Sequence, residues 1–179
     1  MKTTLNHWLH GTRFYVAIAI GLITLNTYWW ASVSFSSPKL VTIRLEESYA
    51  WFGLASLLIA LSLGPLYRLF ELPGRKPVME SRRMFGIGAA WFSSLHVLIA
   101  YIGLFHLANP IVLPSEYQNS FLFGAIAWLI LLAMAFTSFN AALRTMGVWW
   151  FRLHRFVYVA LAATIAHAVT IGSTLHGHR

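Results

Sequence analysis

Apolar residues form five long runs along the chain, separated by short, more polar connections. The runs cover approximately residues 14–33, 49–70, 84–106, 120–140 and 151–172. A helix of about 20 residues crosses a hydrocarbon core of about 30 Å. A spanning segment must be helical, because lipid cannot satisfy free backbone N–H and C=O groups. The pattern therefore predicts an all-α integral membrane protein, with residues 1–179 forming one transmembrane domain, a bundle of five transmembrane helices.

Composition agrees with this class of protein. Apolar residues make up 58% of the chain and charged residues 10%, and the mean hydropathy is +0.65. A soluble domain has roughly half apolar and about a quarter charged residues. The chain contains no cysteine, which excludes disulfides, thiolate-ligated iron–sulfur clusters and covalently attached c-type haem.

Lysine and arginine are distributed unevenly between the two sides of the predicted helices. Ten fall on the side of the N-terminus: Lys2, Arg13, Arg68, Arg75, Lys76, Arg82, Arg83, Arg144, Arg152 and Arg155. Lys39, Arg44 and Arg179 fall on the other side, which carries the longest predicted connections, near 34–48 and 107–119. The positive-inside rule therefore predicts a cytoplasmic N-terminus and a C-terminus outside. This asymmetry explains the net charge of +8 without nucleic acid as a partner, because no soluble domain is predicted to present a basic patch.

Two histidines, His96 and His167, fall in the middle of predicted spans, where no Asp, Glu, Lys or Arg lies. His96 lies 13 residues beyond Arg83, and His167 lies 12 residues beyond Arg155. At about 1.5 Å per residue, both imidazoles reach roughly 18–20 Å from the cytoplasmic side, so they share one depth. An ionisable residue inside the membrane is costly and indicates a function. Neutral imidazole is a good axial ligand of haem iron.

The residues beside these two histidines are small. Ala89, Ser93, Ala100 and Gly103 share the helical face of His96, and Ala160, Ala163, Thr164 and Thr170 share that of His167. Two interpretations follow. The small residues leave room for a haem held between the third and fifth helices, or they serve plain helix packing. A zinc or copper site would need further ligands, and no carboxylate or cysteine is expected at that depth.

His154 falls at the cytoplasmic boundary of the fifth helix, among aromatic and basic residues. It precedes His167 by 13 residues, about 20 Å along a helix. It belongs to a site where electrons arrive from a flavin or quinone, to a second haem, or to the headgroup interface. Arg83, Arg152 and Arg155 are either topology anchors or charge-assisted donors to cofactor phosphates or propionates.

Several of these residues lie in motifs that resemble those of a known family. The motifs are Arg82-Arg83-x-x-Gly86, Leu95-His96, Ala135-Phe136-Thr137-Ser138 and Trp150-x-x-Leu153-His154-x-x-x-Tyr158, followed by His167. Together they resemble the MsrQ family, the haem-binding membrane subunits of periplasmic methionine sulfoxide reductase systems. This family lies within the ferric-reductase-like transmembrane superfamily. The resemblance extends over about Tyr49–Ile171.

The resemblance implies cofactors, partners and location. It implies b-type haem, with His96, His154 and His167 at the positions of the family's functional histidines. It also implies a flavin mononucleotide, a flavin reductase or quinol as cytoplasmic-side donor, and a periplasmic molybdenum enzyme of the MsrP type as acceptor. The location it implies is the bacterial inner membrane. Family members usually have a sixth helix, whereas five are expected here.

The sequence thus predicts a transmembrane b-type cytochrome that relays electrons from a cytoplasmic-side donor to a periplasmic acceptor. His96 and His167 are the expected axial ligands of one haem, and His154 marks the site where electrons arrive or a second haem. The alternatives are a membrane ferric reductase that acts on small acceptors and a non-redox scaffold subunit of a larger membrane complex.

Overall fold

Helices form all the regular secondary structure in the part of the chain that the structure describes. The computed structural model describes the backbone of residues 2–70, 75–104 and 115–177, and the side chains of residues 11, 13–70, 78–79, 81–104 and 117–171. Five helical stretches among these residues are long and apolar enough to cross a membrane. The predicted all-α membrane fold with five transmembrane helices is therefore confirmed. The contacts divide the chain into two compact units, Met1–Leu104 and Phe105–Arg179.

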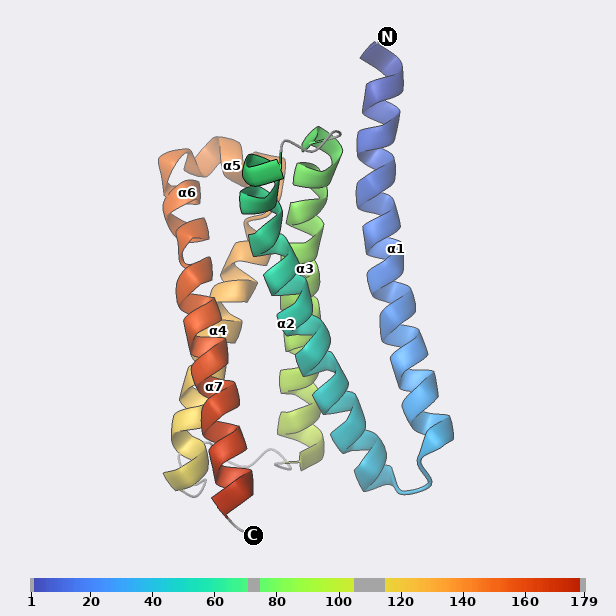
Figure 1. Cartoon of the computed structure of the whole chain (residues 1–179), viewed down its shortest axis with the longest axis vertical. Coiled ribbons are helices and arrows are strands. Elements are labelled where there is room, and N and C mark those ends of the chain that lie inside the picture. The colour runs from blue at the N-terminus through green and yellow to red at the C-terminus, as the bar shows by residue number, and fades with distance from the viewer. Residues whose placement is uncertain (1, 71–74, 105–114, 178–179) are drawn as a thin grey trace. The chain divides into compact units, whose positions relative to one another are not determined.

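The first unit contains three long helices (Figure 1). They are α1 (Lys2–Ser34), α2 (Pro38–Phe70) and α3 (Arg75–Ile99), and α3 continues as a π-helical turn, η1 (Ala100–Leu104). The predicted third span, 84–106, corresponds to the C-terminal part of α3 together with η1, and its last two residues lie outside the described residues. Helix α3 packs against both α1 and α2.

Polar contacts from α2 and α3 meet α1 at one residue, Thr24. The Tyr49 hydroxyl of α2 donates a hydrogen bond to the Thr24 carbonyl at 3.0 Å. The Trp91 indole of α3 donates to the Thr24 hydroxyl at 3.1 Å. Tyr49 also stacks on Phe92 of α3, with ring centroids 6.2 Å apart, and both side chains are buried. The Thr24 contacts thus fix α1 against the pair formed by α2 and α3.

Helix α2 begins at Pro38, well before the predicted start at residue 49. The connection from α1 is therefore residues 35–37, and the long loop predicted over 34–48 is wrong. Charged residues lower the hydropathy of this segment, but they do not prevent a helix. Proline is well suited to a first helical turn. Arg44 and Glu47, one turn apart on the helix surface, form an ion pair of 2.8 Å. Glu46 therefore lies inside a helix that is long and apolar enough to span a membrane.

The second unit contains two long helices and two short ones. They are α4 (Ser115–Phe136), α5 (Asn140–Met146), α6 (Val148–Arg155) and α7 (Val157–Gly177). Helices α4 and α7 pack along each other (Figure 1). The connection predicted over 107–119 is shorter than expected, because α4 already begins at Ser115, and residues 107–114 lie outside the described residues.

The predicted fourth and fifth spans differ from the helices where the chain passes from α4 to α7. Helix α4 ends at Phe136, four residues before the predicted end, and the predicted fifth span is divided between α6 and α7 at Phe156. The Phe156 N–H donates to the Leu153 carbonyl at 3.0 Å, a tighter turn than the α-helix makes. Gly147, with a φ of +53°, makes the corner between α5 and α6. That backbone conformation favours glycine.

Candidate functional site

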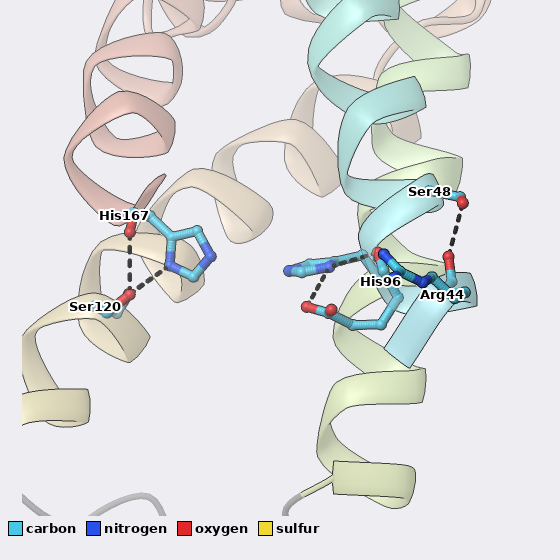
Figure 2. Close-up of polar contacts among 6 residues, drawn as sticks. Arg44, Ser48, His96, Ser120 and His167 are labelled. Atoms are coloured by element: carbon cyan, nitrogen blue, oxygen red, sulfur yellow. Dashed lines mark hydrogen bonds and ion pairs between the residues drawn. The ribbon is translucent and has the colours of Figure 1, made fainter. Parts of the chain in front are cut away.

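His96 is held against α2 through its Nδ1 atom. Nδ1 lies 3.2 Å from the Glu46 backbone carbonyl and 3.1 Å from the Glu46 carboxylate oxygen Oε1 (Figure 2). Because a carbonyl oxygen only accepts hydrogen bonds, Nδ1 carries the proton in this arrangement. In the neutral ring the lone pair then lies on Nε2. With this tautomer, Nε2 is the nitrogen of His96 that could bind a metal ion.

A carboxylate at the depth of His96 was not expected from the sequence. The prediction that no carboxylate is available at that depth is wrong, since Glu46 is part of α2, lies beside His96 and is 17% exposed. Glu46 contacts Nδ1 and therefore acts on His96 from the side opposite Nε2.

The register between α2 and α3 brings Glu46 to His96. Two turns before His96 along α3, Ala89 lies against Gly53, where an added Cβ would sit 3.7 Å from the Ala89 carbonyl and 3.1 Å from the Ser93 hydroxyl. Residues seven apart on a helix lie on one face, and Gly53 and Glu46 have that spacing on α2. The close approach at Gly53 therefore sets the pairing of His96 with Glu46.

A third contact between α2 and α3 has the same register and lies further toward the N-terminus of α3. Two turns before Ala89, the Arg82 guanidinium Nε donates to the carbonyl of Ala60 at 2.7 Å. Gly64 lies beside that guanidinium, since a Cβ there would be in ordinary van der Waals contact with Nη1 at 3.7 Å. The proline at position 65 donates no backbone hydrogen bond to the preceding turn. Arg82 thus binds α2 near this interruption and fixes α3 to it.

The small residues on the His96 face serve helix packing. Ala89 and Ser93 lie against Gly53, and a Cβ on Gly103 would lie 2.5 Å from a methyl carbon of Thr42. Of the two interpretations of this face, close packing of α3 and η1 on α2 is the one that these contacts support. For His167, the small-residue face includes Ala160 and Ala163, both of which are buried.

His167 is held against α4 through the same ring atom. Its Nδ1 lies 2.8 Å from the Ser120 backbone carbonyl and 3.0 Å from the Ser120 hydroxyl (Figure 2). The hydroxyl in turn donates to the His167 carbonyl at 3.2 Å. Ser120 is 1% exposed. The carbonyl contact requires a proton on Nδ1, so Nε2 is the nitrogen of His167 that could bind a metal ion.

Gly124 makes room for the His167 ring one turn after Ser120. A Cβ at this position would lie 2.9 Å from Nδ1 and 3.1 Å from Cε1 of the imidazole. Only a residue without a side chain lets the ring approach the α4 backbone so closely. Ser120 and Gly124 therefore form the seat of His167, and neither was identified from the sequence.

His154 lies on α6 beside Trp150. Its Nδ1 is 2.9 Å from the Trp150 carbonyl, and the two rings stack with centroids 3.7 Å apart. The Trp150 indole donates to the carbonyl of Thr137 at 2.9 Å. Thr137 follows the end of α4, where its hydroxyl and that of Ser138 bond carbonyls of the last helical turn. Two motifs noted in the sequence, Ala135–Ser138 and Trp150–Tyr158, thus meet here.

The predicted arginines lie in different surroundings. Arg152 lies over the Trp149 ring at 4.7 Å from its centroid, and Arg155 is exposed. Arg83 is half-buried on α3. His96 belongs to the first unit, and His154 and His167 belong to separate helices of the second.

The three histidines share one pattern. Each has Nδ1 at a backbone carbonyl, which orients the ring. This pattern is typical of metal-ligating histidine. Among the described side chains, no three of His, Asp and Glu gather as a metal-binding group.

Comparison with known proteins identifies the family. Residues 48–165 match the family described as "Ferric reductase like transmembrane component". The heme-binding subunit MsrQ of the protein-methionine-sulfoxide reductase of Cronobacter sakazakii is 37% identical over 116 residues, 63% of this chain and 56% of that protein. MsrQ of Yersinia pseudotuberculosis is 35% identical over 182 residues, 98% of this chain and 85% of that protein.

A further relative lies outside the methionine sulfoxide reductase systems by name. The magnetosome protein MamZ of Magnetospirillum gryphiswaldense is 36% identical over 124 residues, 68% of this chain but 18% of that protein. No solved structure matches the chain. The chain thus spans about half of the length of the Cronobacter MsrQ, most of the Yersinia MsrQ and a small part of MamZ. On the family match and the Yersinia relative together, this chain belongs to the ferric reductase-like transmembrane family and, within it, to the MsrQ group.

Proposed function

We propose that this protein is a b-type cytochrome of the bacterial inner membrane that relays electrons from a cytoplasmic-side donor to a periplasmic acceptor. The observation that carries the proposal is the contact of Nδ1 with a backbone carbonyl in both His96 and His167, which supports Nε2 as the ligand atom of each ring. The names of the MsrQ relatives, which are heme-binding subunits, support haem as the group that they bind.

In this proposal one haem b is held between α3 and α7. His96 and His167 are the axial ligands, because the basic residues of the cytoplasmic side place them at one depth. Bound haem would supply a one-electron ferric/ferrous couple. The protein's part is to orient the two imidazoles, through Glu46 and Ser120, and to keep the site inside the apolar helices.

His154 is proposed to lie where electrons arrive. Trp150 stacks on its ring, and Arg152 and Arg155 lie on the same helix. Aromatic faces suit stacking against the ring of a flavin mononucleotide or a quinol. Guanidinium groups suit the anionic groups of a flavin. Arg83 is proposed as a further donor to a cofactor phosphate or propionate. A second haem at His154 is the alternative for this end.

The proposed acceptor is a periplasmic methionine sulfoxide reductase of the molybdenum-containing MsrP type. The names of the relatives support it, since each is a subunit of a protein-methionine-sulfoxide reductase. The second candidate function is reduction of small acceptors at the membrane surface. The description of the matched family, ferric reductase like, favours that candidate.

Reporter fusions test the orientation on which the direction of electron flow depends. We expect a C-terminal reporter that is active only outside the cytoplasm to be active, and one inserted near Lys76 to be inactive. The reason is the ten-to-three division of Lys and Arg between the two sides. The opposite pattern would reverse the proposed direction of flow.

Stopped-flow absorbance tests the role of His154. We expect His154→Ala to keep the haem but to be reduced severalfold more slowly by a flavin reductase or quinol, while reoxidation by the periplasmic acceptor changes little. Thr145→Ala is the control, because this exposed side chain donates a hydrogen bond to the Ala141 carbonyl of its own helix. Full-speed reduction of His154→Ala would leave His154 as an interfacial residue. Loss of about half of the haem would favour a second haem there.

A further inference from the structure

Glu46 of α2 and His96 of α3 form a carboxylate–histidine pair between these two helices of the first unit. Oε1 lies 3.1 Å from Nδ1, and each of the two side chains is 17% exposed. Since Nδ1 carries the proton, Oε1 accepts its hydrogen bond. Two further α2–α3 contacts, at Gly53 and at Arg82, hold the register that pairs them. The pair is therefore fixed by the packing of the helices and does not depend on a flexible side chain alone.

Glu47, the next residue, has a different environment. Its carboxylate binds Arg44 at 2.8 Å on the surface, and the two side chains are 47% and 48% exposed. Solvent screens a pair of that kind strongly. The Glu46 charge lies closer to the ligating histidine and in a more apolar place, where electrostatic effects are larger. The two adjacent glutamates thus carry the same charge but differ in their access to His96.

His167 provides a second contrast. Its Nδ1 contacts a neutral carbonyl and a neutral hydroxyl, both of Ser120. A carboxylate partner raises the basicity of a metal-bound histidine more than a neutral acceptor does. Of the two proposed axial ligands, His96 therefore has the stronger electron-donating environment.

We propose that Glu46 sets the reduction potential of the haem that His96 ligates. This inference rests on the proposed function. A negative charge hydrogen-bonded to Nδ1–H increases electron donation from Nε2 and favours the ferric state, which carries one positive charge more than the ferrous state. The one-electron midpoint potential is therefore lower with Glu46 than without it. A lower potential makes the reduced haem a stronger electron donor toward the acceptor.

The backbone of Glu46 makes this role separable from ligand positioning. The carbonyl of the same residue accepts from Nδ1 at 3.2 Å, and a change of side chain retains it. The ring of His96 should therefore keep its tautomer and its orientation in a Glu46 variant. Glu46 is thus a positioning and tuning residue whose loss should change the potential while haem binding persists.

A spectroelectrochemical titration of the purified full chain with bound haem tests the proposal. We expect Glu46→Gln to retain the low-spin spectrum and to shift the midpoint potential to a more positive value. Glu47→Gln removes the same charge one residue away and should leave the potential close to that of the wild type. A Glu46→Gln potential equal to the wild-type value, or an equal shift in both variants, would overturn the proposal.

Loss of haem from a variant or from the wild type would also decide the proposal. If Glu46→Gln does not retain haem, the titration is made on Glu46→Ala, which removes the carboxylate and leaves the carbonyl. Loss of haem from both, with normal binding by Glu47→Gln, would give Glu46 a structural role and overturn the proposal. A wild-type protein that binds no haem would overturn this inference together with the proposed function, whereas an unshifted potential in haem-loaded Glu46→Gln would overturn the inference alone.

Discussion

Replacing either His96 or His167 by alanine is expected to abolish the low-spin haem spectrum of the purified protein. Each variant removes one of two axial ligands, and a low-spin bis-histidine spectrum needs both. The two rings are held in the same way, with Nδ1 at a backbone carbonyl of a neighbouring helix. We therefore expect the two variants to have equally large effects, measured by absorption spectroscopy at matched protein concentration.

A histidine outside the predicted spans provides the control for this pair. His178→Ala should retain the wild-type spectrum, because His178 lies near the C-terminus, beyond the last predicted span. If His96→Ala and His167→Ala both keep an unchanged low-spin spectrum, the assignment of this ligand pair is wrong.

Gly124→Ala should weaken haem retention by about tenfold or more, the size of effect seen when the outer partner of a metal-ligating histidine is lost. The new methyl group would lie 2.9 Å from Nδ1 of His167, so the ring must move away from Ser120. Alanine is a better helix former than glycine by about 1 kcal/mol, so α4 itself should not be destabilised. Haem content after dilution or competition with an apo-haem-binding protein measures the effect.

Gly21→Ala is the matched control for Gly124→Ala. Gly21 lies in the spanning part of α1, and a Cβ there would meet nothing within 4 Å. This variant should bind haem as the wild type does. Equal haem retention by both alanine variants would show that the seat formed by Ser120 and Gly124 does not determine the position of His167.

The sequence predicted the helices well where hydropathy alone decides the structure. Five apolar runs correspond to five spanning helices, because lipid requires helical backbone wherever a long apolar run occurs. The prediction failed at helix ends, where the end of an apolar run does not coincide with the end of the helix. Helix α2 extends to Pro38 through a charged segment. Helix α4 ends early because the Thr137 and Ser138 hydroxyls bond its last carbonyls and Trp150 donates to the Thr137 carbonyl.

The sequence singled out the two histidines of the candidate site but not the residues that hold them. His96 and His167 stood out because ionisable residues inside spans are rare. Glu46 is 50 positions away from His96 along the chain, and Ser120 is 47 away from His167. Such pairs depend on the register of neighbouring helices, which a single sequence does not specify. Extending α2 to Pro38 would have brought Glu46 into consideration, since it would then have been an acidic residue within a span.

The absorption spectrum of the purified wild-type chain, recorded oxidised and reduced after expression with haem available, tests the central claim most directly. The proposal predicts a Soret band with the low-spin features of a bis-histidine haem, and haem that acid–organic solvent extracts because no covalent attachment holds it. A purified, folded protein without a Soret band would contradict the proposal and would favour a scaffold role in a larger membrane complex.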